Sequence, residues 1–330
     1  MVEGLVSVVI PVLDRADLLR EAVSSVVAQT YPRWEIVIVD DGSTDDTPAA
    51  IEELVRAEPA RIRALRQDNA GPGAAREAGR RAARGEFLQF LDSDDLLLPR
   101  KLELQVASLR SETGAGASYG PTRERLRDGT VRSPIRRTGE VLSRLLPALL
   151  AGRVWITATP LYRAQVCEAA GGWSDLRFDE DWEFEARIGA LGVALAHVDE
   201  TVAERRFHGE GHAGSGAPAD PVRLRQQARA HESILASAGR ARVDVDAPEL
   251  ARFSRSLFLL ARRCGAAGLT GESRRLFGLA REAVGPVRRA GLDFRAYRAL
   301  AAVLGWTLAG RLAVASDRWR GPGEDPPSGG

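Results

Sequence analysis

The stretch EIVIVDDGSTDDTPAAIEELVRA (35–57) contains an apolar run, two aspartates, a polar turn and a helix-like segment, in that order. The same alternation of short β-rich runs and longer helical stretches extends from Val6 to Leu91. The flanking runs are VSVVI (6–10), ADLLREAVSSVVAQ (16–29), RIRAL (61–65), PGAAREAGRRAA (72–83) and EFLQFL (86–91). Because strands that alternate with helices form βαβ units, the pattern predicts an α/β fold with a mainly parallel sheet. The strands are nearly all apolar, as expected when helices cover both faces of the sheet.

Acidic residues follow three of these strands. Asp14 comes after the first strand, two aspartates (40–41) follow the second, and the DSDD run (92–95) follows the fourth. Ligands of such sheets bind at the carboxyl ends of the strands, so we expect these acids to share one rim. Turns and helix caps account for some of them, but three carboxylates within four positions repel one another unless a cation compensates. Asp92 and Asp94 therefore predict a site for Mg²⁺ or Mn²⁺, which prefer oxygen ligands.

The composition is that of an ordinary globular chain. Among 330 residues, 44% are apolar and 28% are charged, which excludes the collagen-like, disordered and disulfide-scaffold classes. The 46 basic and 45 acidic side chains give a net charge of +1, so we expect no nucleic-acid partner. Cys167 and Cys264 form no CxxC pair, which suits a reducing compartment. The first residues carry no basic region of a signal peptide, so we expect a cytoplasmic location.

The rest of the chain is expected to complete the sheet and then to become helical. Less regular strands are predicted between about residues 97 and 208, in AGASYG (115–120), VWITATP (154–160) and VALAHVD (193–199). A stretch rich in glycine, proline and alanine predicts a mobile loop or domain boundary near 209–221. Amphipathic stretches between 222 and 319 predict helices, including a helical hairpin.

The last helical stretch sets Leu300, Leu304, Leu308 and Leu312 four residues apart. Packing on the body of the protein is the simpler interpretation of this row, and a membrane surface is the alternative. The uncharged run Ala299–Gly310 is shorter than the roughly 18 to 20 residues that span a bilayer, so we expect no transmembrane helix. Three roles of the C-terminal helices stay open: docking of a protein partner, homo-oligomer formation, and peripheral contact with the inner membrane face.

Six motifs, taken in order, resemble those of the family 2 glycosyltransferases, which have a GT-A fold. They are VSVVIPVLDR (6–15), VDDGSTDDT (39–47), NAGPGAAREAG (69–79), FLDSDD (90–95), GGWSDLRFDEDWEFEAR (171–187) and RRFHGEG (205–211). The resemblance covers roughly residues 5–215. It implies a GT-A catalytic domain at 1–215, with a mainly parallel, Rossmann-like sheet flanked by helices. We expect a helical C-terminal extension to follow at 216–320, and a disordered tail at 321–330.

The resemblance also implies roles for single residues. Asp92 and Asp94 match the DxD motif, which holds a divalent cation against the diphosphate of a sugar nucleotide. His208 fits a later position that often completes the metal or diphosphate site, and Asp181 matches the general base. The residues implied for binding the nucleotide sugar are Pro11, Asp14, Asp40, Asp41, Arg76, Asp92, Ser93 and Glu180.

The expected reaction moves a sugar from a nucleotide-diphosphate sugar, with a UDP-sugar favoured, to an acceptor hydroxyl. A metal, Mn²⁺ or Mg²⁺, and nearby Arg76 would stabilise the leaving diphosphate. A carboxylate would take the proton of the attacking hydroxyl, and the anomeric centre would invert. We expect a place in bacterial polysaccharide or glycoconjugate synthesis. Two alternatives are a nucleotidyltransferase, whose lysine-containing phosphate loop is missing from this sequence, and a non-catalytic module that binds nucleotide sugars or glycans.

The acceptor is not identified by these motifs. Its specificity is expected in the loops between residues 121 and 160 and in the segment after 208. One of these loops, RERLRDGTVRSPIRR (123–137), is basic and suits a polar or phosphorylated acceptor, although a solvated surface is the simpler interpretation.

Overall fold

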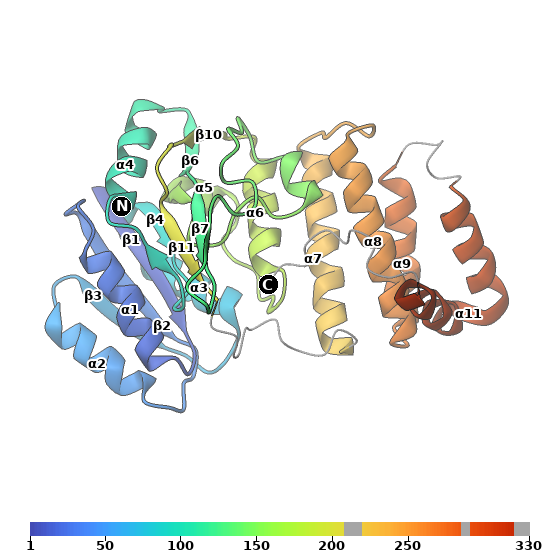
Figure 1. Cartoon of the computed structure of the whole chain (residues 1–330), viewed down its shortest axis with the longest axis horizontal. Coiled ribbons are helices and arrows are strands. Elements are labelled where there is room, and N and C mark those ends of the chain that lie inside the picture. The colour runs from blue at the N-terminus through green and yellow to red at the C-terminus, as the bar shows by residue number, and fades with distance from the viewer. Residues whose placement is uncertain (208–219, 285–290, 320–330) are drawn as a thin grey trace.

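The strands predicted in the first ninety residues form one side of a larger sheet (Figure 1). The computed structural model describes residues 1–207, 220–284 and 291–319, and within them this sheet has seven strands in the order β10-β6-β9-β4-β1-β2-β3. β9 runs antiparallel to β4 and β6, and the remaining neighbours are parallel. The expected mainly parallel α/β fold is confirmed. The strands are β1 Val2–Val12, β2 Trp34–Asp40, β3 Ile62–Arg66, β4 Gly85–Phe90, β6 Ala115–Tyr119, β9 Leu161–Arg163 and β10 Ala194–His197.

Helices cover both faces of the sheet because its central strands are apolar on both sides. The helices of this part are α1 Ala16–Val27, α2 Thr47–Ala57, α3 Pro72–Ala82, α4 Lys101–Ser111, α5 Ala164–Ala169 and α6 Glu180–Ala190. Val8 and Ile10 of β1 belong to a buried cluster that includes α1 and α4. Val9 points to the opposite face, where a Cβ added at Gly79 of α3 would lie 2.3 Å from Val9 Cγ1. Glycine at position 79 therefore lets α3 approach the sheet closely.

The strand register determines where the acidic turns lie. Val12 at the end of β1 pairs with Asp40 at the end of β2. β4 lies on the other side of β1. Directly after β4, Leu91 N donates a hydrogen bond of 3.0 Å to Val9 O of β1. Because β1, β2 and β4 are parallel, the chain leaves all three at the same edge of the sheet, where ligands of such folds bind.

The segment after β4 completes this sheet only in part. AGASYG and VALAHVD contain β6 and β10 as predicted, but the prediction of a strand at VWITATP (154–160) is wrong. Thr159 N closes a turn onto Ile156 O at 2.9 Å, and Thr159 O accepts a hydrogen bond of 2.7 Å from the buried Lys101 Nζ. These backbone groups are satisfied by a turn and a side chain, so they are not available to a neighbouring strand.

Four short strands form a separate small sheet in the order β5-β11-β7-β8. They are β5 Leu96–Leu97, β7 Thr122–Arg125, β8 Val131–Arg132 and β11 Ala203–Arg206. A short 3-10 helix, Ala148–Ala151, precedes β9.

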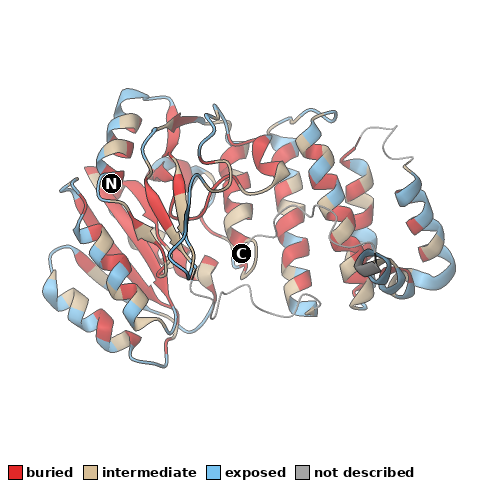
Figure 2. Ribbon diagram, in the orientation of Figure 1, coloured by how far each residue is buried: buried red, intermediate tan, exposed pale blue. Residues whose placement is uncertain are grey.

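The helices after residue 220 extend the core of the sheet domain (Figures 1 and 2). They are α7 Pro221–Arg240, α8 Pro248–Ala266, α9 Thr270–Glu282 and α11 Leu292–Trp319. Trp182 of α6 meets His231 of α7 and Phe253 of α8 edge-on, with ring centroids 5.2 and 5.7 Å apart. The helical C-terminal extension is thus confirmed. The boundary expected near 209–221 falls largely on residues outside those described, as does the tail expected at 321–330.

The last helix, α11, is exposed along much of its length (Figure 2). Leu304, Leu308 and Leu312 are 39%, 50% and 52% exposed, so the core-packing interpretation of the leucine row is wrong for these three. The helix contacts α8 instead through Gly310, whose missing side chain lets the two backbones meet. By length and composition alone, residues 292–317 could cross a membrane, which the short uncharged run did not predict. Gly305, with φ 76° and ψ 162°, interrupts the helical backbone inside this stretch.

Replacing Gly310 with alanine should push α11 away from α8. The added Cβ would lie 2.4 Å from Ala266 N and 2.7 Å from Arg262 O, and these atoms belong to a rigid helical backbone. Overpacking of this kind typically costs about 1–3 kcal/mol, so urea denaturation should give a lower free energy of unfolding for Gly310→Ala. Gly278→Ala in α9 is the matched control, since no described atom lies within 4 Å of its added Cβ. Equal stability of the two variants would contradict this packing.

Candidate functional site

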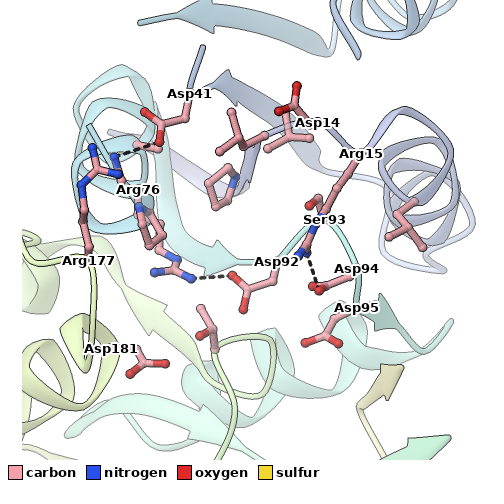
Figure 3. Close-up of a pocket in the computed structure, with 18 of the residues that line it drawn as sticks. Asp14, Arg15, Asp41, Arg76, Asp92, Ser93, Asp94, Asp95, Arg177 and Asp181 are labelled. Atoms are coloured by element: carbon pink, nitrogen blue, oxygen red, sulfur yellow. Dashed lines mark hydrogen bonds and ion pairs between the residues drawn. The ribbon is translucent and has the colours of Figure 1, made fainter. Parts of the chain in front are cut away.

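A cleft of about 1300 Å³ opens at the carboxyl edge of the sheet. Its walls come from the loops after β1, β2 and β4, from the start of α6 and from β11 (Figure 3). Most of the residues predicted for the site line it, namely Pro11, Asp14, Asp41, Arg76, Asp92, Ser93, Asp94, Glu180 and Asp181. The parallel strands have therefore brought together acids that lie far apart in the sequence.

Asp41 fixes the turn that leads into α3. Its buried carboxylate accepts hydrogen bonds from Ala70 N at 2.9 Å and from Gly71 N at 2.8 Å. Gly71 has φ 95°, a left-handed conformation that glycine adopts without strain. A Cβ at this position would lie 2.6 Å from Cγ of Arg177. The glycine thus allows both the turn and the close approach of Arg177 to the cleft wall.

Asp14 and Asp40 occupy different environments. Asp14 is exposed in the cleft and accepts a hydrogen bond of 2.7 Å from a backbone amide of the loop after β2. Asp40 is buried and is not among the described residues that line the cleft. Its Oδ1 accepts from Ser43 N at 2.8 Å, and its Oδ2 lies 3.2 Å from Arg66 Nη1. The Asp40 carboxylate thus faces its own loop and β3 in this structure, and its expected place in the nucleotide pocket stays a prediction.

Three carboxylates of the DSDD run meet on one side of the cleft. One oxygen each of Asp92, Asp94 and Asp95 lie within 4.8 Å of one another, and Arg15 Nη1 pairs with Asp94 Oδ2 at 2.5 Å. Burial, and the charges of Asp94 and Asp92, raise the pKa of Asp95 well above its usual value. A group of oxygen donors whose mutual repulsion a cation would relieve fits Mg²⁺ or Mn²⁺. The side chains present therefore fit a divalent metal.

Arg76 of α3 connects the acidic cluster to the start of α6. Its buried guanidinium donates from Nη2 to Asp92 Oδ1 at 2.6 Å and from Nη1 to Glu180 Oε1 at 2.8 Å. It also lies 4.8 Å over the ring of Trp173. Burial opposes the charge, but Asp92 and Glu180 outweigh it and raise the pKa of Arg76. Burial, together with the charge of Asp181, raises the pKa of Glu180 as well.

Asp181 lies on the far side of the cleft from Asp14 and Asp41 (Figure 3). Its Oδ2 is 2.5 Å from Nη1 of Arg153, and Nη2 of the same guanidinium is 3.6 Å from Glu185 Oε1. Burial, helped by the charge of Asp181, raises the pKa of Glu185 to about 8 although Arg153 opposes the shift. At neutral pH the charge of Arg153 is therefore matched by Asp181, not by Glu185.

Some cleft residues were not predicted as part of the site. Asp95 lies within the DSDD run, so the sequence itself indicates that it stands beside the proposed metal ligands. Arg153 stands in AGRVW (151–155), which carries no motif, and it meets Asp181 only through the fold. His208, expected at the metal or diphosphate site, lies outside the described residues.

Residues 7–159 match the model of the family described as Glycosyl transferase family 2. Over this range, which is slightly less than half of the chain, the protein is similar to the family 2 glycosyltransferases. The matched range begins within β1, contains β2 to β4, the acidic cluster and Arg153, and ends before α6. Asp181 lies outside this range and reaches the cleft through the fold. The resemblance to family 2 is confirmed over the matched range, which holds four of the six motifs nearly whole.

The relatives extend the likeness beyond that range. A Bacillus subtilis protein named glycosyltransferase EpsH is 30% identical over 215 residues, covering 62% of this chain and 61% of that protein. The chondroitin synthase of Escherichia coli is 28% identical over 214 residues, covering 62% of this chain and 29% of its own length. The chain thus spans less than two thirds of the length of each of these two relatives.

The fold of nearly the whole chain has a solved counterpart. The structure of S. aureus TarS residues 1–349 in complex with UDP-GlcNAc superposes with a TM-score of 0.69, covering 97% of this chain and 93% of that one. The sequence identity is 17%, so this likeness supports the GT-A fold with its C-terminal helices.

Glu185 should make the stability of the family 2 domain depend on pH. Its folded pKa of about 8 is above the ordinary value of 4.5, so the stability it contributes is complete below about pH 4.5 and is lost as pH rises toward 8. Each unit of pKa difference corresponds to about 1.4 kcal/mol. The free energy of unfolding of the wild type, measured in urea from pH 5 to pH 8, should fall relative to Glu185→Gln.

The control for this series is Glu52→Gln, which replaces an exposed glutamate on α2. Its difference from the wild type should stay constant over the same pH range. If the curves of the wild type and Glu185→Gln run parallel from pH 5 to pH 8, the assigned protonation of Glu185 is incorrect.

Proposed function

We propose that this family 2 glycosyltransferase moves a sugar from a nucleotide-diphosphate sugar to an acceptor hydroxyl, with a divalent metal and with inversion at the anomeric carbon. The observation that carries the proposal is that Asp92, Asp94 and Asp181 line one cleft although they come from distant parts of the chain. A departing diphosphate requires positive charge, and an attacking hydroxyl requires a base. The side chains of this cleft meet both requirements.

The donor nucleoside is proposed to bind against Pro11, Asp14 and Asp41, with the diphosphate toward Asp92 and Ser93. These side chains line one wall of the cleft. Asp40 is left out of this set because its carboxylate is bound to Ser43 N and Arg66. A UDP-sugar is the favoured donor, since TarS, which shares the fold, has structures named as complexes with UDP-GlcNAc and with UDP.

Asp92 and Asp94, with Asp95 beside them, would hold the metal, which when bound supplies positive charge to the diphosphate oxygens. Arg15 and Arg76 add fixed positive charge on the same wall, because a guanidinium keeps its charge at physiological pH. Their ion pairs with Asp94 and Asp92 orient these carboxylates in the cleft. The chain thus brings both cationic and anionic groups to the place where the leaving group develops its charge.

Asp181 is proposed as the general base. A carboxylate about 3 Å from the acceptor hydroxyl can accept its proton as the new glycosidic bond forms, a contribution typically of about 10²–10⁴ in rate. The ion pair with Arg153 orients this carboxylate at the start of α6. Attack on the face of the sugar opposite the departing diphosphate inverts the anomeric centre.

The proposed setting is bacterial polysaccharide or glycoconjugate synthesis in the cytoplasm. The name of the chondroitin synthase relative supports a polysaccharide product. Cys167 and Cys264 are buried, free thiols, which suits a reducing compartment.

Binding of donor and metal tests the proposal directly. A screen of UDP-, GDP- and dTDP-sugars by thermal shift with Mn²⁺ should show stabilisation that EDTA removes, largest with a UDP-sugar. Asp94→Asn should weaken Mn²⁺ binding at least roughly tenfold by isothermal titration calorimetry, since even indirect metal partners contribute that much. Asp175→Asn, at an exposed acid that pairs with Arg229, is the control. Nucleotide binding indifferent to EDTA, together with unchanged Mn²⁺ affinity of Asp94→Asn, would refute metal dependence.

Asp181→Asn should separate chemistry from donor binding. Removing the proposed base should lower the transfer rate by about 10²–10⁴-fold, with the Kd for the donor nearly unchanged. Transfer is measured with the donor found in the screen, and NMR of the product gives its anomeric configuration, expected to be inverted. Rate loss accompanied by an equal loss of donor affinity would argue against a base, and net retention would refute single displacement.

A further inference from the structure

Arg153 pairs with Asp181 on the acceptor side of the cleft, and the charges of Arg153 and Arg205 act on Arg136. Arg153 and Arg205 line the cleft itself, the first from the segment between β8 and β9 and the second from β11. Arg136 comes from the same segment as Arg153, two residues after the cis peptide bond Ser133–Pro134. Arg136 and Arg153 lie between residues 121 and 160, one of the two parts of the chain in which the acceptor specificity was expected.

Among the residues that the structure describes, no acid forms an ion pair with Arg136. Its guanidinium makes no hydrogen bond or ion pair with a residue that the structure describes, and its Nε atom is buried without a partner. Burial, together with the charges of Arg153 and Arg205, lowers the pKa of Arg136 to about 10, and the opposing effects of Asp181 and Glu185 do not compensate. Arg136 therefore lies at a point where positive charge is in excess.

The backbone also holds Arg136 in an uncommon conformation. Its φ is 54°, a left-handed value that is strained for a side chain other than glycine and that is often found where ligands bind. Hydrogen bonds on either side of it, Ile135 N to Thr122 O at 2.8 Å and Arg137 N to Val154 O at 3.1 Å, fix this geometry. The guanidinium is thus held near Arg153 by the fold.

The neighbours of Arg153 and Arg205 also favour the binding of an anionic group. Arg205 Nη1 is 3.5 Å from Glu124 Oε1, a longer contact than the 2.5 Å pair of Arg153 and Asp181. Glu185, with its raised pKa, is protonated at neutral pH and adds no negative charge. Guanidinium groups match the planar oxygen pairs of phosphates and carboxylates and bind them through two parallel hydrogen bonds.

We propose that Arg136, Arg153 and Arg205 form a subsite for a phosphate or carboxylate group carried by the acceptor, beside the hydroxyl that attacks the donor. The proposal rests on the proposed function, in which Asp181 is the base. The subsite belongs to the acceptor because Asp181 lies across the cleft from Asp14 and Asp41 on the donor wall (Figure 3). An acceptor anion that engages Arg153 competes with Asp181 for the guanidinium, which frees the carboxylate to accept the hydroxyl proton.

The test is binding of small anionic alcohols to the protein saturated with UDP and Mn²⁺. Isothermal titration calorimetry with glycerol 3-phosphate and with glycerate should detect binding that uncharged glycerol does not show. Arg136→Gln should weaken it roughly tenfold, as expected for one charge-assisted hydrogen bond, and Arg136→Lys should retain part of it. Arg132→Gln is the matched control, since Arg132 is an exposed arginine of β8, four residues before Arg136. Circular dichroism confirms that each variant is folded.

A separate titration with UDP distinguishes the possible results. Unchanged UDP affinity in Arg136→Gln, with weaker binding of either anion, supports the subsite. Equal weakening of UDP would assign the arginines to the donor diphosphate and overturn the proposal. The proposal also fails if the wild type binds neither anion, or if Arg136→Gln binds both as tightly as the wild type does. If UDP does not bind to the wild type, the donor assignment fails, and the same anion titrations without nucleotide still test the subsite.

Discussion

The cleft depends on one buried cation, the guanidinium of Arg76. It is almost excluded from solvent and pairs with Asp92 after β4 and with Glu180 at the start of α6. A buried charge is costly unless it is paired and hydrogen-bonded, so loss of either partner would leave an uncompensated ion. Because these partners come from segments far apart in the sequence, the pairing of Arg76 links the proposed metal site to the helix that carries Asp181.

The two walls of the cleft differ in the charged side chains that they carry. On the donor wall, Asp92, Asp94 and Asp95 concentrate negative charge that Arg15 and Arg76 offset only in part. On the proposed acceptor wall, burial raises the pKa of Glu185, and Arg136 has no ion-pair partner among the described residues. A metal-bound diphosphate suits the first wall and an anionic acceptor suits the second. This arrangement also separates the proposed base from the acids that would hold the metal.

The chain uses arginine for nearly every cationic contact. Its single lysine, Lys101, is buried and donates to Thr159 O, where a compact ammonium bonds one carbonyl. Arginine reaches two partners from one side chain, as Arg76 and Arg153 do. The arginine-rich composition gives no signature of nucleic-acid binding, yet in the folded chain it supplies the pairs that position the acids of the cleft.

The sequence alone determined the half of the sheet built from residues 6–91, the rim of acidic turns and the family, because strand and helix periodicity and turn chemistry are local properties of the chain. It did not determine what each side chain faces. Asp40 and Asp41 are adjacent, yet only Asp41 lines the cleft, and the apolar run 154–160 became a turn because Lys101, far away in sequence, bonds its backbone. The ion pair of Arg153 with Asp181 and the exposure of the α11 leucines were likewise decided by tertiary structure. Both depend on contacts between segments far apart in the sequence, which local patterns do not predict.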